Sequence, residues 1–154
     1  MSTVNQIVSA LKAKLETLPG VDASSSDVYL PPVESQSIAL IIPPFGQETR
    51  VEALSARRGQ LMQSHRIRCE FWVKINTGDL ATTLARAREI GLLACRALIA
   101  DQSLGEKVSR VGFYGHGSEG PRVDVEVTDR PVQIAQAPYI VVTVIIGVID
   151  YSDA

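Results

Sequence analysis

Apolar and polar residues alternate along residues 63–75 (QSHRIRCEFWVKI). The odd positions carry Ile67, Cys69, Phe71, Val73 and Ile75, and the even positions carry Arg66, Arg68, Glu70 and Lys74, with Trp72 as the exception. A period of two predicts a strand with one buried and one accessible face. At about 3.3 Å per residue the stretch would span about 43 Å, far more than a common strand of about 5–6 residues. We therefore expect the strand to extend past its own domain and to serve in assembly.

Two other stretches have the spacing of amphipathic helices. The first covers residues 4–18, with Ser2 or Thr3 as its N-cap and Pro19-Gly20 as its stop. The second covers residues 80–100, with Thr77 or Asp79 as its cap. Its alanines and Gly91 would permit a close approach to a sheet.

Further strands are predicted at 36–42, 107–114, 122–128 and 139–150, with a short extended piece at 28–30. The strand at 139–150 is apolar on both faces, so both faces need a cover. Residues 107–114 and 122–128 are expected to form an antiparallel hairpin, and residues 22–27, 45–60 and 129–138 are expected to be connections. The order α-β-β-α-β-β-β predicts an α+β fold, a mostly antiparallel sheet with two main helices packed on one side.

The connection at 45–60 (FGQETRVEALSARRGQ) is longer than most loops and is rich in arginine. Its middle has the composition of a helical turn. It is either a mobile solvated loop or a loop that becomes ordered on a partner. In the second case it is a candidate contact with that partner.

Composition places the chain among ordinary globular domains. Its 154 residues, 45% hydrophobic and 21% charged, are expected to form a single domain over 1–154. A net charge of −2 favours neither a nucleic-acid binder nor a polyanionic tail. Cys69 and Cys95 match no metal or redox spacing and are expected on buried faces. We see neither a secretion signal nor a membrane-length apolar run, which predicts a soluble protein made in the cytoplasm.

The candidate chemistry is sparse. Residues 115–120 (GHGSEG) match a nucleotide-binding G-x-G-x-x-G, but Pro121 and an alternating strand follow where that motif requires a helix. His65 and His116 have no partners at metal-ligand spacing, and Ser118 does not stand in a G-x-S-x-G motif. We therefore predict a protein that is not an enzyme, without cofactor, metal or catalytic residues.

The interface candidates are Arg50, Arg57, Arg58, Arg66, Arg68, Glu70, Trp72 and Lys74. The arginines could contact an acidic partner, or form a solvated surface balanced by nearby glutamates. Tryptophan and arginine are enriched at the centres of protein interfaces. Trp72 on the polar face of the long strand is therefore either part of an interface, or covered by the first helix or the 45–60 segment.

The chain resembles the tail terminator, or tail completion, proteins of long-tailed bacteriophages. The resemblance spans nearly the whole chain: the N-terminal helix, the strand HRIRCEFWVKI, the alanine-rich helix, the turn DQSLGEKV at 101–108 and the apolar last strand. It implies a virion protein that forms a homohexameric ring at the head–tail junction. Such a ring caps the tail tube, stops its polymerisation and presents a surface to the head's connector or stopper protein, while DNA passes through the lumen without specific binding.

Three alternatives stay open. A head-closure or head–tail adaptor protein and a tail-tube subunit would have similar patterns, and a small-ligand or nucleotide-binding enzyme would use the 115–120 glycine loop. The resemblance implies assembly in the host cytoplasm and no membrane partner. In such an assembly the 45–60 connection is the candidate contact with the neighbouring ring or tube. The even face of the long strand is the expected ring-facing or lumen-facing surface.

Overall fold

A computed structural model describes residues 3–31, 37–45, 47–54, 60–76, 79–105, 110–111, 123–128, 130–134 and 137–153. The elements are α1 (Val4–Leu15), β1 (Val21–Ser25), β2 (Ile38–Ile41), β3 (Glu48–Leu54), β4 (Gln60–Lys74), α2 (Leu80–Ala100), β5 (Arg110–Val111), β6 (Val123–Val127), β7 (Val132–Ile134) and β8 (Ala137–Asp153). Within these residues the strands form one eight-stranded sheet. The predicted α+β class, with a mostly antiparallel sheet, is confirmed.

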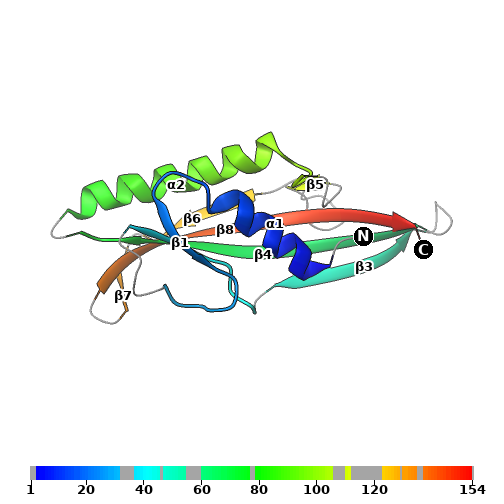
Figure 1. Ribbon diagram of the computed structural model, residues 1–154, viewed down its shortest axis with the longest axis horizontal. Helices are drawn as coiled ribbons and strands as arrows, with labels where there is room; N and C mark the ends of the chain where they lie inside the picture. Colours follow the sequence, from blue (N-terminus) through cyan, green and yellow to red (C-terminus); the bar gives the residue numbers. More distant parts are fainter. Residues whose placement is uncertain are drawn as a thin grey trace.

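Two long strands form the spine of the sheet. The 15 residues of β4 pair antiparallel with β8 from Gln60↔Asp153 to Lys74↔Tyr139. On the outer side of β4 lie β2 and β3, and on the outer side of β8 lie β5, β6 and β7. Figure 1 shows the paired ends of β3, β4 and β8 extending beyond both helices. The predicted long strand is therefore present, and it is longer than expected.

Both helices begin at the caps that the sequence offers. Thr3 and Gln6 form a reciprocal capping box at the start of α1. The Asp79 carboxylate accepts a hydrogen bond from the Thr82 backbone N–H at 3.1 Å and caps α2. These bonds satisfy backbone donors that have no partner inside the helix. The boundaries of α2 match the predicted ones.

The main core lies between the sheet and the two helices. It combines the odd side chains of β4, among them Ile67 and Phe71, with even side chains of β8 such as Val142 and with the buried stripes of α1 and α2. The odd face of the long strand is therefore the core face, as predicted. Gly91 brings α2 close to the sheet: a Cβ at this position would lie 2.7 Å from Val125 Cγ1.

Two segments that the sequence analysis treats as connections are strands. Residues 48–54 form β3, which pairs with β4 from Glu48↔Arg66 to Leu54↔Gln60, so the predicted loop with a helical turn is wrong. Residues 21–25 form β1, which pairs parallel with β2. Both gain regular structure because a neighbouring strand supplies hydrogen-bond partners. The predicted extended piece at 28–30 contains no strand.

The predicted hairpin between residues 107–114 and 122–128 is not formed by their described residues, 110–111 and 123–128. In the described part of these segments, β5 pairs with β8 at Val111↔Val148 and β6 pairs with β8 at Val123↔Ile146. The two strands therefore follow one another along the same edge of β8, which is long enough to pair with both. The connection at 129–138 contains β7, which forms a hairpin with the start of β8.

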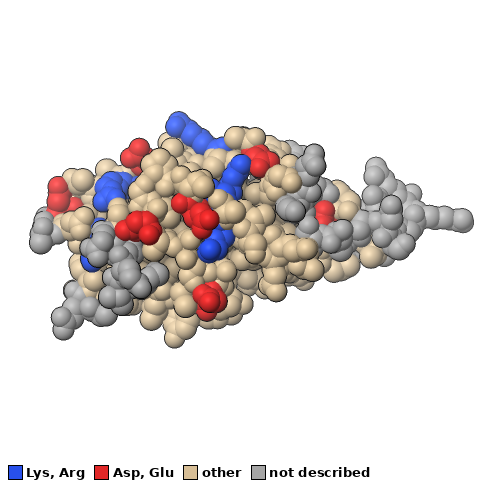
Figure 2. All heavy atoms as spheres, in the orientation of Figure 1, with Lys and Arg blue, Asp and Glu red and all other residues tan. Residues whose placement is uncertain are grey.

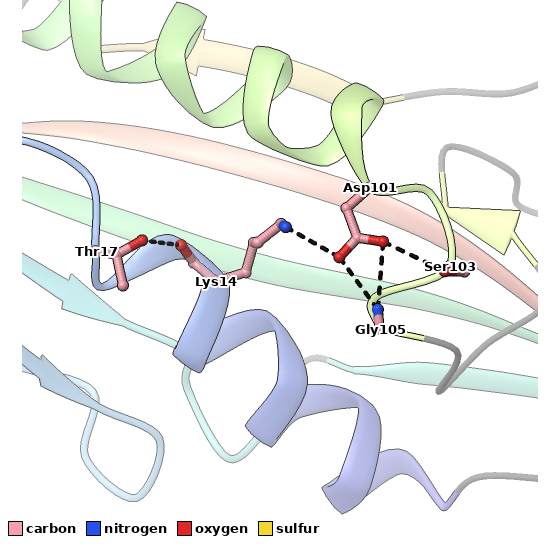
Figure 3. Close-up of polar contacts among 5 residues, drawn as sticks. All are labelled: Lys14, Thr17, Asp101, Ser103 and Gly105. Carbon is pink, nitrogen blue, oxygen red and sulfur yellow. Dashed lines mark hydrogen bonds and ion pairs between the residues drawn. The ribbon is translucent and has the colours of Figure 1, made fainter.

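A polar contact joins α1 to the end of α2 (Figure 3). Lys14 Nζ donates to Asp101 Oδ2 at 2.9 Å, and the same carboxylate accepts from the Gly105 backbone N–H at 3.1 Å. The Lys14 hydrogen bond, and then the Gly105 bond, lower the pKa of Asp101. Leu104 and Gly105 both have positive φ, and the buried Leu104 side chain packs into the core. The predicted turn after the second helix is thus a left-handed one held by Asp101.

Candidate interaction surface

The five interface candidates in β4 lie on one face of the sheet, opposite the helices. They are Arg66, Arg68, Glu70, Trp72 and Lys74, which alternate with the core residues of the strand. We call this side of the sheet the helix-free face. The period-two pattern therefore predicts correctly which side chains share a face. It does not predict which of them are accessible.

The charged residues of this face form ion pairs within the chain. Arg66 lies 3.5 Å from a Glu48 carboxylate oxygen, and Arg68 lies 3.6 Å from one of Glu70. The Arg66 and Arg68 side chains are roughly half exposed, whereas that of Glu70 is largely covered. Such surface pairs stabilise a fold by about 0–1 kcal/mol. Their main effect here is to hold the arginine side chains over the sheet.

Trp72 is buried, not exposed. It is 6% accessible and packs with Ala39, Ile41, Tyr139 and Val141 in a second cluster. Its ring meets that of Tyr139 edge-on, with the centroids 5.7 Å apart, a favoured aromatic geometry. The helix α1 is not its cover, because α1 packs on the other face of the sheet. The strands around Trp72 thus build a small core of their own.

A pocket opens beside Trp72 on the helix-free face. It has a volume of about 350 Å³ and is lined by Tyr29, Leu30, Pro43, Phe45, Arg68, Glu70 and Trp72. Tyr29 is 57% exposed and Phe45 61% exposed, and their ring centroids lie 5.7 Å apart. We call Tyr29, Leu30 and Phe45 the aromatic patch. Exposed apolar groups of this kind gathered at one place mark interaction sites.

The aromatic patch was missed by the sequence reasoning because its members follow two different strands. Tyr29 and Leu30 come after β1, and Phe45 comes after β2. The parallel pairing of β1 with β2 carries both segments to the same end of the sheet. The sequence does contain one signal for the ends of these strands. Prolines follow the apolar run of each segment, and prolines stop strands and turn the chain. That signal gives no indication that the segments meet.

The pKa of the Glu70 carboxyl, which lines the pocket, is shifted by its surroundings. Burial raises the pKa of its carboxyl above the ordinary value, while the nearby Arg68 opposes the shift. A carboxylate between an arginine and aromatic rings can accept hydrogen bonds from a partner. Nothing in this arrangement supplies a nucleophile with an activating base.

A second exposed apolar surface lies at the opposite edge of the sheet. Leu92 is 52% exposed and Ile99 64% exposed on α2, and Val125 on β6 is also exposed. The close contact of α2 with β6 at Gly91 places this turn of the helix over Val125, and Leu92 and Ile99, seven residues apart, lie on one side of α2. We call Leu92, Ile99 and Val125 the helix-edge patch. The sequence analysis does not predict this patch.

The helix-side face carries charges of both signs. Figure 2 shows lysine and arginine interspersed with aspartate and glutamate on the side that bears α1. Mixed charge of this kind is typical of a solvated surface. No single-sign patch on this view points to a polyanionic partner.

A buried histidine lies on the helix side of β4. His65 is 1% accessible, and its Nδ1 lies 2.9 Å from Thr49 Oγ1 on β3. Its Nε2 is buried without a hydrogen-bond partner. Burial lowers the pKa of the imidazole, and the Asp150 carboxylate opposes the shift. His65 is therefore a neutral core residue in this fold.

This burial predicts a pH dependence of stability. Because the folded chain protonates His65 less readily than the unfolded chain, the unfolded state binds more protons below the ordinary pKa of 6.5. The free energy of unfolding should therefore fall as the pH falls below about 6.5. The contribution of one such group is at most about 1.4 kcal/mol per pH unit. Urea titrations between pH 4.5 and 7 would measure the slope.

Two substitutions separate the contributions of His65 and Glu70 to this pH dependence. His65→Gln should flatten the slope, whatever its effect on stability at pH 7. Glu70→Gln should steepen it, because the raised pKa of Glu70 makes the folded state bind more protons above pH 4.5 and so opposes the histidine. A His65→Gln variant with the wild-type slope would contradict the assignment.

Two of the predicted interface residues, Arg57 and Arg58, lie outside the described part of the chain. So do His116, Ser118 and the glycine loop at 115–120, which the alternative of a ligand-binding enzyme would use. Arg50 belongs to β3, where it pairs with Ser64, but its side chain is not described. The predicted interface residues whose side chains the structure describes are therefore the five candidates in β4.

The described residues contain no group of three His, Cys, Asp or Glu side chains that could hold a metal ion. Cys69 is buried, as expected, while Cys95 is only partly covered, and both are free thiols. In the same part of the chain no helix is long and apolar enough to cross a membrane. A comparison with known protein families and a search for similar curated proteins each find no match for this chain.

Proposed function

We propose that the chain is a structural subunit of a bacteriophage tail terminator, a homohexameric ring at the head–tail junction of the virion. The ring caps the head-proximal end of the tail tube, stops its polymerisation and offers the attachment surface to the head's connector or stopper protein. DNA passes through its lumen without specific contacts. The proposal includes no catalytic step, no cofactor and no membrane partner.

One observation carries this proposal furthest. The spine of β4 and β8 extends beyond the helices, and apolar side chains are exposed at both edges of the sheet. A subunit of a closed ring contacts its two neighbours through two different surfaces. The aromatic patch and the helix-edge patch are the two exposed apolar surfaces that could serve as these contacts. The sequence resemblance to tail terminators adds the specific role.

A tube-capping assay tests the proposal. The tail-tube protein of the phage that encodes this chain is polymerised with and without the purified chain, and the tubes are examined by negative-stain electron microscopy. We expect shorter tubes with ring-shaped density at one end only. The tube protein alone is the control.

The same images distinguish the rival functions. Filaments made by the chain itself would favour a tail-tube subunit. Tubes of unchanged length with bare ends, together with binding of the chain to purified heads, would favour a head-closure or adaptor protein. Tubes of unchanged length, together with no binding of the chain to heads, would contradict the proposed function and both of these rivals.

A further inference from the structure

The strand β3 is an edge strand of the sheet. It pairs with β4 along its whole length, and no strand among the described residues pairs with its other side. Figure 1 shows β3 at the margin of the sheet, next to β4. In an edge strand, every second residue directs its backbone N–H and C=O away from the neighbouring strand. The seven residues of β3 therefore offer a row of hydrogen-bonding groups to which another strand can add.

An exposed apolar side chain lies at the centre of this edge strand. Val51 is the fourth of the seven residues of β3 and is 56% exposed. It lies on the face of the sheet that bears the helices, because it pairs with Gln63, an odd position of β4 like the core residue Ile67. Burial of such a side chain against a second apolar residue is favourable.

The sequence of β3 is complementary to itself in one antiparallel register. Two copies of ETRVEAL can run antiparallel with Val51 opposite Val51. Arg50 then stands opposite Glu52 on both sides of the centre, and Thr49 stands opposite Ala53. Directly opposed residues have Cβ atoms about 4.5–5.5 Å apart, so opposite charges at these positions attract one another. The arrangement has two-fold symmetry, since each copy contributes the same residues.

The neighbouring registers are less favourable. A shift by two residues in one direction places Arg50 opposite Arg50 and Glu48 opposite Glu52. The same shift in the other direction places Glu52 opposite Glu52. Like charges that are directly opposed destabilise a strand pair. A shift by one residue places Val51 opposite a charged residue and exchanges the faces of the added sheet. The register centred on Val51 is therefore the one in which charged and apolar residues both match.

We infer that β3 of one copy adds to β3 of a second copy around a two-fold axis at Val51. Val51 pairs with its counterpart, and two pairs of Arg50 with Glu52 form across the contact. The partner is a second copy of this chain, because the order of charges in β3 complements itself. A two-fold contact differs from the contact between neighbours in a closed ring, where two different surfaces meet. The inference therefore goes beyond the proposed ring and describes a dimer of the free chain.

Charge reversal tests the inferred register. Arg50→Glu places a glutamate opposite Glu52 twice in the dimer, and Glu52→Arg places an arginine opposite Arg50 twice. Each variant alone should dimerise at least tenfold more weakly than the wild type, measured by analytical ultracentrifugation up to millimolar concentration. An equal mixture of the two variants should form a 1:1 heterodimer, since each opposed pair again has opposite charges. Arg88→Glu on α2 makes the same charge change at an exposed position outside β3, and it should dimerise like the wild type.

A cysteine at the centre of β3 tests the position of the axis. Opposed Cα atoms in an antiparallel pair lie about 4.5–5.5 Å apart, within the range of about 4.4–6.8 Å that a disulfide spans. We expect Val51→Cys to form a disulfide-linked dimer after oxidation with diamide, seen by non-reducing electrophoresis. Glu48→Cys is the control and should stay largely unlinked, because the two copies of residue 48 would lie about 20 Å apart. The wild type, treated in the same way, controls for Cys69 and Cys95.

Three results would overturn the inference: a wild-type chain without a dimer at millimolar concentration, a mixture of the charge-reversed variants that associates no better than either variant alone, and a Glu48→Cys variant that crosslinks as readily as Val51→Cys. Circular dichroism and urea titration verify that each variant folds. The tube-capping assay is read separately. A chain that caps tubes without dimerising removes the inference and leaves the proposed function in place, and a chain that dimerises without affecting tubes does the reverse.

Discussion

Replacing Phe71 by alanine is expected to lower the free energy of unfolding by about 3–5 kcal/mol. Phe71 has no accessible surface and is among the largest fully buried side chains of the described chain. It lies in β4, between Leu40 of β2 and Val142 of β8. Removing the ring leaves a cavity that the surrounding strands and helices cannot close, because interiors are densely packed.

Urea unfolding would measure this loss as a lower midpoint at an unchanged slope. The matched control is Phe45→Ala, which removes the same ring from a position 61% exposed. That change should cost less than about 1 kcal/mol, since the ring is already largely in water. Equal losses at the two positions would contradict the placement of the main core under the helices.

Replacing Leu11 by alanine is expected to lower the free energy of unfolding by about 2–5 kcal/mol. Leu11 lies fully buried in the stripe of α1 that also contains Ile7 and Leu15. A helix of 12 residues is marginal by itself in water, so packing supplies most of its stability. Loss of Leu11 should therefore loosen the whole of α1, together with the Lys14–Asp101 contact to the end of α2.

Ser9→Ala is the control within the same helix. Ser9 is exposed, and alanine has the higher helix propensity, so this change should be neutral or slightly stabilising. Hydrogen exchange at the backbone amides of α1 gives a second readout. Leu11→Ala should speed exchange along α1 well before that of β4 and β8. A loss in stability below about 1 kcal/mol would contradict the docking of α1 on the sheet.

The local sequence pattern was sufficient to predict the elements with strong hydrophobic periodicity. The two helices, β4 and β8 appear where the sequence places them, because each carries a long apolar repeat and each helix has a capping residue. The core face of β4 is correct for the same reason. The fold class follows from these elements alone, since a long sheet with two amphipathic helices has few ways to bury its apolar surface.

The short strands could not be predicted from their own residues. The β3 segment ETRVEAL combines Glu, Ala and Leu, residues that favour helix, and it becomes a strand at the edge of β4. Strand propensity depends strongly on the neighbouring strand. The hairpin expected for residues 107–128 fails for a related reason: the 17 residues of β8 offer a longer edge than the two segments offer each other.

The sequence by itself determined the helices, the two long strands and the division of β4 into a core face and a second face. Only the tertiary structure decided how that second face is used: Trp72 is buried by Ile41 and Tyr139, while Tyr29 and Phe45 become exposed. It also brought α2 and β6 together in the helix-edge patch. The physical reason is that periodicity reports which side of an element is apolar. What covers that side depends on contacts between residues far apart in the chain.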